Sequence, residues 1–278
     1  MVTKYFINIF LLILTNSIYT FPSYHGLLLP NSSYALTSND VNYKFSKSIL
    51  IDSMYTSNLE TTLITLPNDI SINTLQYIHS YKKYSNTATI SIINYGFFED
   101  SESGYTFSSE DYILQNTLTY QLTPPLYSSI GLKYMHSNID NVSANAITLN
   151  FSCHYIYKNF LIQVFSDNLG LIINSYTNFT ESLPIVHGFK MMYSPQYLKS
   201  ILSFKYDYFN ETKIIHLSYE LLSFKYASFL VGYSSLAQDL YYGDFDSDFF
   251  TGISFGVGTQ YKGFMINLAG KNLGPLGL

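Results

Sequence analysis

Residues 252–261 read GISFGVGTQY and change character at every position. Ile253, Phe255 and Val257 are bulky and apolar, whereas every even-numbered residue of the segment is glycine, serine or glutamine. Successive side chains of a β-strand point to opposite faces of its sheet. The segment therefore predicts a strand with one apolar face and one small or polar face.

The same alternation recurs along the chain. In residues 143–155, SANAITLNFSCHY, apolar side chains alternate with threonine, asparagine, serine and histidine. Three further segments alternate in the same way: 127–137, 200–209 and 212–222. A register shift of one residue would move Lys205 or Glu220 to the apolar face, so the pattern specifies the register strongly.

About fourteen such segments, separated by clusters of turn-forming residues, make up the chain after its N-terminal part. We expect strands near 43–52, 60–66, 71–81, 87–97, 112–121, 127–137, 143–155, 158–168, 184–194, 198–208, 212–223, 225–235, 249–261 and 263–270. Several connections are short, which favours antiparallel hairpins between neighbouring strands. An even number of antiparallel strands can close into a barrel, which leaves no sheet edge exposed to lipid.

The composition favours a transmembrane barrel over a soluble sandwich. Only 12% of the 278 residues are charged, whereas soluble domains usually carry about 25%. Aromatic residues make up 18% of the chain, and no apolar run approaches the length of about 20 residues that a membrane helix needs. Tyrosines are typical of the aromatic girdles of outer-membrane barrels. The alternative is a soluble secreted β-protein whose apolar faces are buried against each other.

The charged residues and the cysteine exclude other classes. All 14 cationic side chains are lysines and the net charge is −5, so the chain lacks the arginines on which nucleic-acid recognition usually relies. Cys153 is the single cysteine, which excludes an internal disulfide framework. It lies in an alternating segment beside His154, and adjacent strand residues point to opposite faces, so we interpret Cys153 as structural.

The N-terminal residues predict export. Residues 1–20 combine Lys4 with an apolar stretch and small residues near the end, as secretory signal peptides do. We expect residues 21–42 to form a lead-in or plug segment and residues 43–278 to form the barrel. A signal followed by a barrel predicts the outer membrane of a diderm bacterium, with outer-membrane lipid around the protein.

The motifs of catalysis and cofactor binding are not found in the sequence. We therefore expect no enzyme activity and no cofactor. Asp244, Asp246 and Asp248 alternate as in a calcium loop. However, position 249 is phenylalanine where the calcium loop needs its glycine, and no glutamate follows at the required spacing. A solvated acidic loop is the favoured interpretation.

Three glycines, Gly252, Gly256 and Gly258, fall on the polar face of the segment 252–261. Glycine within a strand marks a close approach of another group or a sharp bend. The glycines predict either a filled or constricted interior or local coiling of the sheet.

Several short motifs occur in a fixed order and resemble the PorV/PorQ family. They are Tyr95-Gly96, which we expect to end a strand, Phe107-Ser108 and Asp111-Tyr112, which we expect to open the next strand, Gly131-Leu132-Lys133-Tyr134, Asn168-Leu169-Gly170, and its second copy Asn272-Leu273-Gly274. The resemblance extends over roughly residues 85–278. The family's N-terminal Gly-rich stretch and Asn-Pro-Ala motif are not present in residues 27–40, LLLPNSSYALTSND.

The resemblance implies a fourteen-stranded, FadL-like barrel in the outer membrane. It also implies a non-enzymatic role in type IX secretion, where such proteins serve cargo attachment at the cell surface and contact surface or secretion-system proteins. The motif positions carried over without a defined role are Tyr95, Gly96, Phe107, Asp111, Tyr112, Asn168, Gly170, Asn272 and Gly274. A FadL-like transporter of hydrophobic compounds is the alternative function, although the inward faces expected here are polar and small.

Overall fold

The computed structural model describes residues 24–38, 57–66, 69–99, 104–176, 182–209, 211–222, 227–235, 251–261 and 264–272. Two short helices, η1 (His25–Leu28) and α2 (Ser33–Ser38), precede a set of β-strands. Neither of these helices is long or apolar enough to cross a bilayer. The predicted signal peptide, the predicted strand 43–52 and the acidic residues Asp244, Asp246 and Asp248 lie outside the described ranges.

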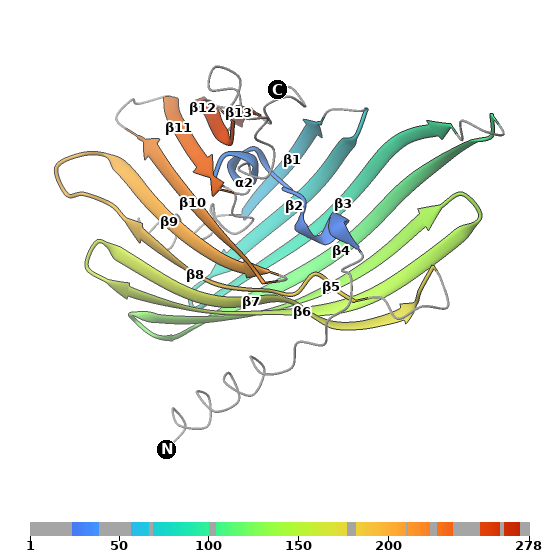
Figure 1. Ribbon diagram of the computed structural model, residues 1–278. Coiled ribbons are helices and arrows are strands. Elements are labelled where there is room, and N and C mark those ends of the chain that lie inside the picture. Colours follow the sequence, from blue (N-terminus) through green and yellow to red (C-terminus); the bar gives the residue numbers. More distant parts are fainter. Residues whose placement is uncertain are drawn as a thin grey trace.

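The fold is all-β, and its strands form one antiparallel sheet of 13 strands in which each strand pairs with its neighbours in sequence. The strands are β1 (Ser57–Thr65), β2 (Ser71–Tyr81), β3 (Tyr84–Glu99), β4 (Thr106–Thr123), β5 (Leu126–Ile139), β6 (Val142–Tyr157), β7 (Phe160–Asn174), β8 (Val186–Tyr193), β9 (Ser200–Phe209), β10 (Thr212–Leu221), β11 (Ala227–Ser234), β12 (Ile253–Tyr261) and β13 (Phe264–Lys271). Each overlaps one of the predicted segments from 60–66 onward, so these predictions are confirmed. Figure 1 shows the sheet curving around α2.

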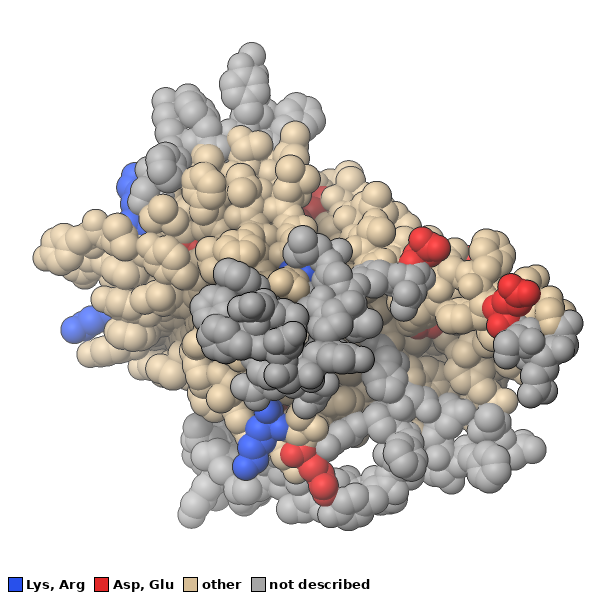
Figure 2. Space-filling model, turned by 45° about the horizontal axis from the view of Figure 1, so that its top comes forward, with Lys and Arg blue, Asp and Glu red and all other residues tan. Residues whose placement is uncertain are grey.

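The two faces of the sheet differ as the alternation predicts. On the outer face, apolar side chains are exposed, for example Leu132 at 53% and Leu217 at 48%. On the inner face, polar side chains are buried, among them Thr148, His154 and Glu220 at 1% exposed or less. This distribution is the reverse of that in a soluble protein. Much of the described surface in Figure 2 is accordingly uncharged.

Two strands continue beyond the ends that the sequence predicts. β3 runs past Tyr95-Gly96 because the strand bulges between Asn94 and Phe97, where Gly96 has a φ of 81°. β7 runs to Asn174 because it contains an irregularity at Asn168, whose φ is 61°. A bulge adds one residue and reverses the alternation beyond it. The prediction that Tyr95-Gly96 ends a strand is therefore wrong.

The prediction that Asp111-Tyr112 opens a strand is also wrong, because β4 begins at Thr106 and both residues lie inside it. The strands β3 to β7 are 14 to 18 residues long, whereas β8 to β13 have only 8 to 10 residues. The turns that join β6 to β7 and β8 to β9 lie at the same end of the sheet, since Phe160 pairs with Tyr193. The extra length of β3 to β7 therefore projects at the opposite end.

The sheet is open in the part of the chain that the structure describes. Strand direction alternates along the 13 strands, so β1 and β13 run the same way, and no pairing between them is present among the described residues. Antiparallel closure needs a further strand between these two edges. Among the described residues the structure therefore shows an open antiparallel sheet of 13 strands and not the expected closed barrel of about fourteen.

The register can be tested with the native cysteine. Ser128 on β5 lies directly opposite Cys153 on β6, and both are on the outer face. Directly opposed residues have Cα atoms about 4.5–5.5 Å apart, which a disulfide can bridge. We expect Ser128→Cys to form an intramolecular disulfide on mild oxidation, measured by mass spectrometry of unreduced peptides. The control Ile130→Cys, which lies opposite Phe151, should form little; an equal yield from both variants would contradict the register.

Candidate functional site in the sheet interior

The N-terminal segment 24–38 occupies the inner side of the sheet, and α2 lies against β10 to β13. The part of the sheet that α2 contacts contains glycines on its inner face. A Cβ atom added at Gly232 would collide with the carbonyl oxygen of Thr37, and one at Gly256 would lie 3.2 Å from the Thr37 Cγ2. Ser254 on β12 donates a hydrogen bond from its Oγ to the Thr37 carbonyl over 2.8 Å. Of the predicted glycines, Gly256 and Gly258 face α2, and Gly232, which was not among those predicted, makes the tightest approach to it. Gly252 instead takes a positive φ of 87° just before β12.

Local hydrogen bonds hold α2 in shape. The Ala35 N–H donates to the Ser32 Oγ over 3.0 Å, which satisfies one of the free N–H groups of the first turn. Tyr34 is buried and its hydroxyl oxygen lies 3.7 Å from where a Cβ at Gly258 would sit. Burial raises the pKa of Tyr34, and the nearby Glu220 raises it further. The Tyr34 hydroxyl therefore stays protonated at all physiological pH values.

The first part of the segment packs against the other half of the sheet. Tyr24 stacks on Tyr176 with ring centres 6.2 Å apart, and its hydroxyl donates to the carbonyl oxygen of Asn174 over 3.2 Å. Leu27 is buried in the same apolar cluster, which includes Ile72, Ile93 and Met135 from β2, β3 and β5. Residues 24–38 thus connect two regions of the sheet that are distant in sequence.

Two of the motif residues lie in this contact. Tyr95 donates from its hydroxyl to the Asp111 Oδ2 over 2.7 Å. Ser137 donates to the other carboxylate oxygen of Asp111, and Tyr176 donates to Ser137. A side chain at Gly26 of η1 would collide with Asp111. Tyr95 and Asp111 therefore form part of the surface on which η1 rests.

A third motif residue, Asn168, fixes the bulge of β7. Its side-chain oxygen accepts a hydrogen bond from the Lys133 Nζ over 2.7 Å, and its Nδ2 donates to the carbonyl oxygen of Pro184 over 3.1 Å. Its backbone N–H donates to the Asn150 Oδ1 over 2.9 Å. Asparagine tolerates positive φ better than most residues. Gly170 follows where a Cβ would collide with the backbone of β6.

The other motif positions do not join these contacts. Gly96 has positive φ, and its N–H donates to the Asn94 Oδ1 over 2.7 Å. Phe107 stacks on Phe98 with ring centres 5.4 Å apart. Tyr112 is exposed on the outer face and Asn272 exchanges backbone hydrogen bonds with residues 252 and 253. Gly274 lies outside the described residues. The motif positions carried over from the resemblance therefore do not form one site. They lie in the interior, on the outer face and at the margin of the sheet.

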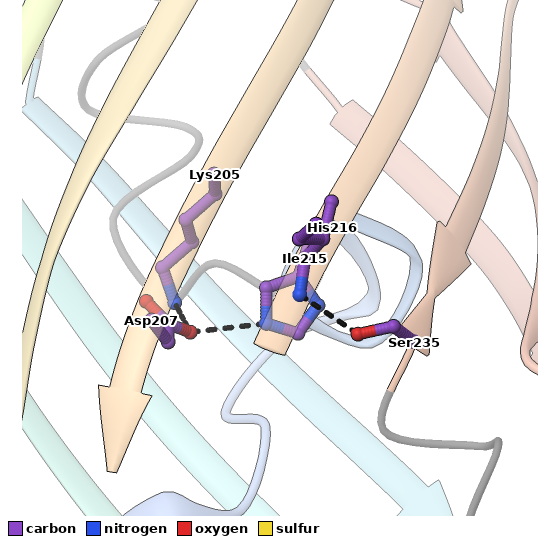
Figure 3. Close-up of polar contacts among 5 residues, drawn as sticks. All are labelled: Lys205, Asp207, Ile215, His216 and Ser235. Carbon is purple, nitrogen blue, oxygen red and sulfur yellow. Dashed lines mark hydrogen bonds and ion pairs between the residues drawn. The ribbon is translucent and has the colours of Figure 1, made fainter. Parts of the chain in front are cut away.

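A charged group that the sequence did not link lies on the inner face of β9 and β10 (Figure 3). The Lys205 Nζ lies 2.7 Å from the Asp207 Oδ2, and the His216 Nε2 lies 3.0 Å from the same oxygen. Lys205 also lies over the ring of Phe165, 5.2 Å from its centre. The alternation predicts that Lys205 and His216 face inward, but their meeting at Asp207 depends on the cross-strand register.

Small cavities with polar and apolar linings remain in the interior. One cavity of about 40 Å³ is lined by side chains that include Asn31, Gln115, Ser129 and His154. The His154 Nε2 lies 3.0 Å from the Ser152 Oγ at this cavity. A water molecule needs about 10–15 Å³ of such volume, so the cavity has room for a few waters.

No group of three or more histidine, cysteine or acidic side chains that could hold a metal ion occurs among the described residues. Cys153 lies on the outer face with Ile147 and Tyr155. No protein-family model matches the sequence, and a search of the curated proteins finds no significant match.

The contact between α2 and Gly232 of β11 can be tested by adding one methyl group. We expect Gly232→Ala to lower the free energy of unfolding by about 1–3 kcal/mol, because overpacking against the rigid backbone at Thr37 cannot relax through a side chain. Denaturant unfolding followed by circular dichroism measures this value, and limited proteolysis reports whether residues 24–38 leave the interior. The control is Gly270→Ala on β13, where a Cβ meets nothing within 4 Å. Equal effects of the two substitutions would contradict the contact.

Proposed function

We propose that this chain is an outer-membrane β-barrel protein that acts as a non-enzymatic scaffold for protein secretion or surface attachment. The observation that carries the membrane part of the proposal is the reversed distribution of polarity in the sheet. Every strand from β1 to β13 carries exposed apolar side chains on its outer face, while the inner face buries serine, threonine, lysine and aspartate. Lipid around the outer face accounts for this distribution.

The outer face also has the dimensions of a membrane band. Tyr112 and Tyr120 lie on the outer face of β4, eight positions apart, which corresponds to about 26 Å of strand. At a tilt of about 40° this length spans about 20 Å of the bilayer, close to the apolar band of about 25 Å in such barrels. Leu114 and Leu118 lie between the two tyrosines, and both are exposed. Two aromatic girdles enclosing an apolar band fit this spacing.

One pair of polar side chains within the band is hydrogen-bonded. Asn86 on β3 and Asn116 on β4 face outward and exchange two amide hydrogen bonds of 3.1 and 3.2 Å. An amide in hydrocarbon without a partner costs about 4–8 kcal/mol relative to water. The reciprocal pair leaves each side chain with a donor and an acceptor satisfied, which supports placement of this face against lipid.

Closure of the sheet is part of the proposal. β1 and β13 run in the same direction, so one strand antiparallel to both would complete an even-numbered barrel. Residues 43–52, which the sequence predicts as a strand, precede β1 and are proposed for this position. The resulting barrel of about fourteen strands is FadL-like in the sense that the resemblance to the PorV/PorQ family implies.

The filled interior supports a scaffold rather than a channel. Residues 24–38 pack on both halves of the inner face, and the cavities beside them are small. A protein that holds partners at the membrane needs no open lumen. The proposed partners are surface or secretion-system proteins, and the proposed location is the outer membrane of a diderm bacterium with residues 1–20 as the export signal.

A FadL-like transporter remains the alternative, because one outer surface could accept a hydrocarbon. A groove of about 660 Å³ lies on the outside of the sheet, and its lining includes Phe160, Met191, Leu217, Val231 and Ile253. Transport would require this groove to communicate with the interior, where residues 24–38 pack against an apolar cluster and against the glycines of β11 and β12. Uptake of fatty acids into vesicles that contain the purified protein would favour the transporter over the scaffold.

The membrane placement can be tested at Leu132, which lies opposite Asn116 in the middle of the band. We expect Leu132→Lys to lower the free energy of unfolding in lipid vesicles by about 2–4 kcal/mol, because a lysine at the bilayer midplane is poorly solvated. The control is Tyr197→Lys, in a fully exposed turn. A soluble protein would tolerate lysine at the 53% exposed Leu132 within about 0.5 kcal/mol. Such tolerance would contradict the proposal.

The scaffold role can be tested by deleting the gene in its host and comparing the proteins of the cell surface with those of the medium. We expect proteins that are attached to the surface in the wild type to appear in the medium of the deletion strain. Complementation with the wild-type gene should restore attachment. An unchanged distribution would overturn the scaffold role while leaving the membrane placement intact.

A further inference from the structure

Because strand direction alternates, successive connections between strands lie at opposite ends of the sheet. The turns after β2, β4, β6 and β8 lie at one end, which we call the lysine end. The connections after β1, β3, β5, β7 and β9 lie at the other end, which we call the acidic end. The extra length of β3 to β7 belongs to the acidic end.

Exposed charge is separated between these ends. The exposed charged residues in the described turns of the lysine end are Lys82, Lys83, Lys158 and Lys199, with no aspartate or glutamate among them. The exposed acidic residues at the acidic end are Asp69, Glu99, Asp140 and Glu211, next to one exposed lysine, Lys213. Figure 2 shows lysines near the left margin and acidic side chains near the right margin, and also one basic and one acidic side chain next to each other at the lower centre.

The sequence of the connections outside the described residues continues this separation. Residues 223–226 and 262–263, which follow β10 and β12, contain Lys225 and Lys262 and no acidic residue. Residues 236–250, which follow β11, contain four aspartates and no lysine. Lysines therefore occur in five of the six connections of the lysine end, and the turn after β4 is the exception.

Aromatic side chains lie directly beside these lysines. Lys82 places its Nζ 5.0 Å from the ring centre of Tyr81, and Lys158 places its Nζ 5.3 Å from the ring centre of Tyr157. Both tyrosines are more than half exposed. Tyrosine at the edge of an apolar band marks the headgroup level of a bilayer. A lysine beside it extends its charge into the same layer or just beyond it.

From this arrangement, and resting on the proposed membrane placement, we infer that the lysine end is embedded in the anionic headgroups of the surrounding lipid leaflet, whose phosphate oxygens the lysine ammonium groups contact. The turns after β2 and β6 are only two residues long, so they offer a protein partner little surface. The lysines are distributed from one hairpin to the next rather than gathered in one patch. Lipid surrounds a barrel on all sides, and a distributed ring of charge matches it.

The test measures lipid selectivity of the full-length protein in vesicles. Spin-labelled phosphatidylglycerol and spin-labelled phosphatidylcholine report the relative association of anionic and zwitterionic lipid with the protein surface. The lysine variant combines Lys82→Gln, Lys83→Gln, Lys158→Gln and Lys199→Gln. The matched control combines Asp69→Asn, Glu99→Gln, Asp140→Asn and Glu211→Gln. Each combination changes four exposed charges at one end.

We expect the wild type to prefer the anionic lipid by about twofold or more at low salt, and to lose most of this preference in about 1 M salt, where surface charges are screened. The lysine variant should show no preference, and the acidic-end control should keep the wild-type preference. Equal preference in the wild type and the lysine variant would overturn the inference.

Further measurements distinguish lipid binding from a site for free anions and from a protein partner. Inorganic phosphate at the concentration of the lipid phosphate should leave the preference unchanged; its abolition by free phosphate would overturn a lipid site in favour of an anion site. An acidic protein that co-purifies with the wild type but not with the lysine variant, without any lipid preference, would assign the lysines to a protein partner and overturn the inference. Failure of the wild type to enter vesicles at all would instead overturn the proposed membrane placement.

Discussion

The structure depends on a single constraint, which is the two-residue alternation of side chains across a continuous ladder of antiparallel strands. Each strand places its apolar residues on the outside only while its register with both neighbours holds, as between Ile130 and Phe151. A slip of one residue would bring Lys133 or Asp207 to the outer face and bury leucine among polar groups. Because every strand is paired to the next, the register of one hairpin constrains the whole sheet, and the inner polar groups meet only when it is kept.

The interior is organised by residues 24–38. η1 rests on Tyr95 and Asp111, while α2 rests on the glycines of β11 and β12, so the segment joins early and late strands of the sheet. Some buried charged groups of the inner face are paired, as the Asp207 Oδ2 is with Lys205 and His216. Buried charges are tolerated in proteins when they are paired and hydrogen-bonded. Residues 24–38 fill part of the interior between early and late strands.

Strand positions and faces could be predicted from the sequence because alternation is a local property, legible in segments such as 143–155. The strand ends were predicted less well: Gly96 and Asn168 take positive φ inside β3 and β7, and the resulting bulges interrupt the pattern that marks a strand. The interior contacts could not be predicted, because they join residues far apart in sequence, as Thr37 and Ser254 do. The inward direction of Lys205 followed from alternation, but its partner Asp207 lies on the same strand and the shared His216 on the next, which only the register reveals.

The unequal strand lengths make the molecule lopsided. β4 measures about 60 Å along its length and β8 about 26 Å, given their 18 and 8 residues. The extra strand length lies beyond the band between Tyr112 and Tyr120. At this end of the sheet, β3 to β6 therefore project further than the shorter strands. The projecting part consists of hydrogen-bonded strands. Phe97, whose side chain is 87% exposed, lies on it. The strands β8 to β13 do not project in this way. This end of the sheet is therefore asymmetric, and a molecule that contacts it meets different surfaces on its two sides.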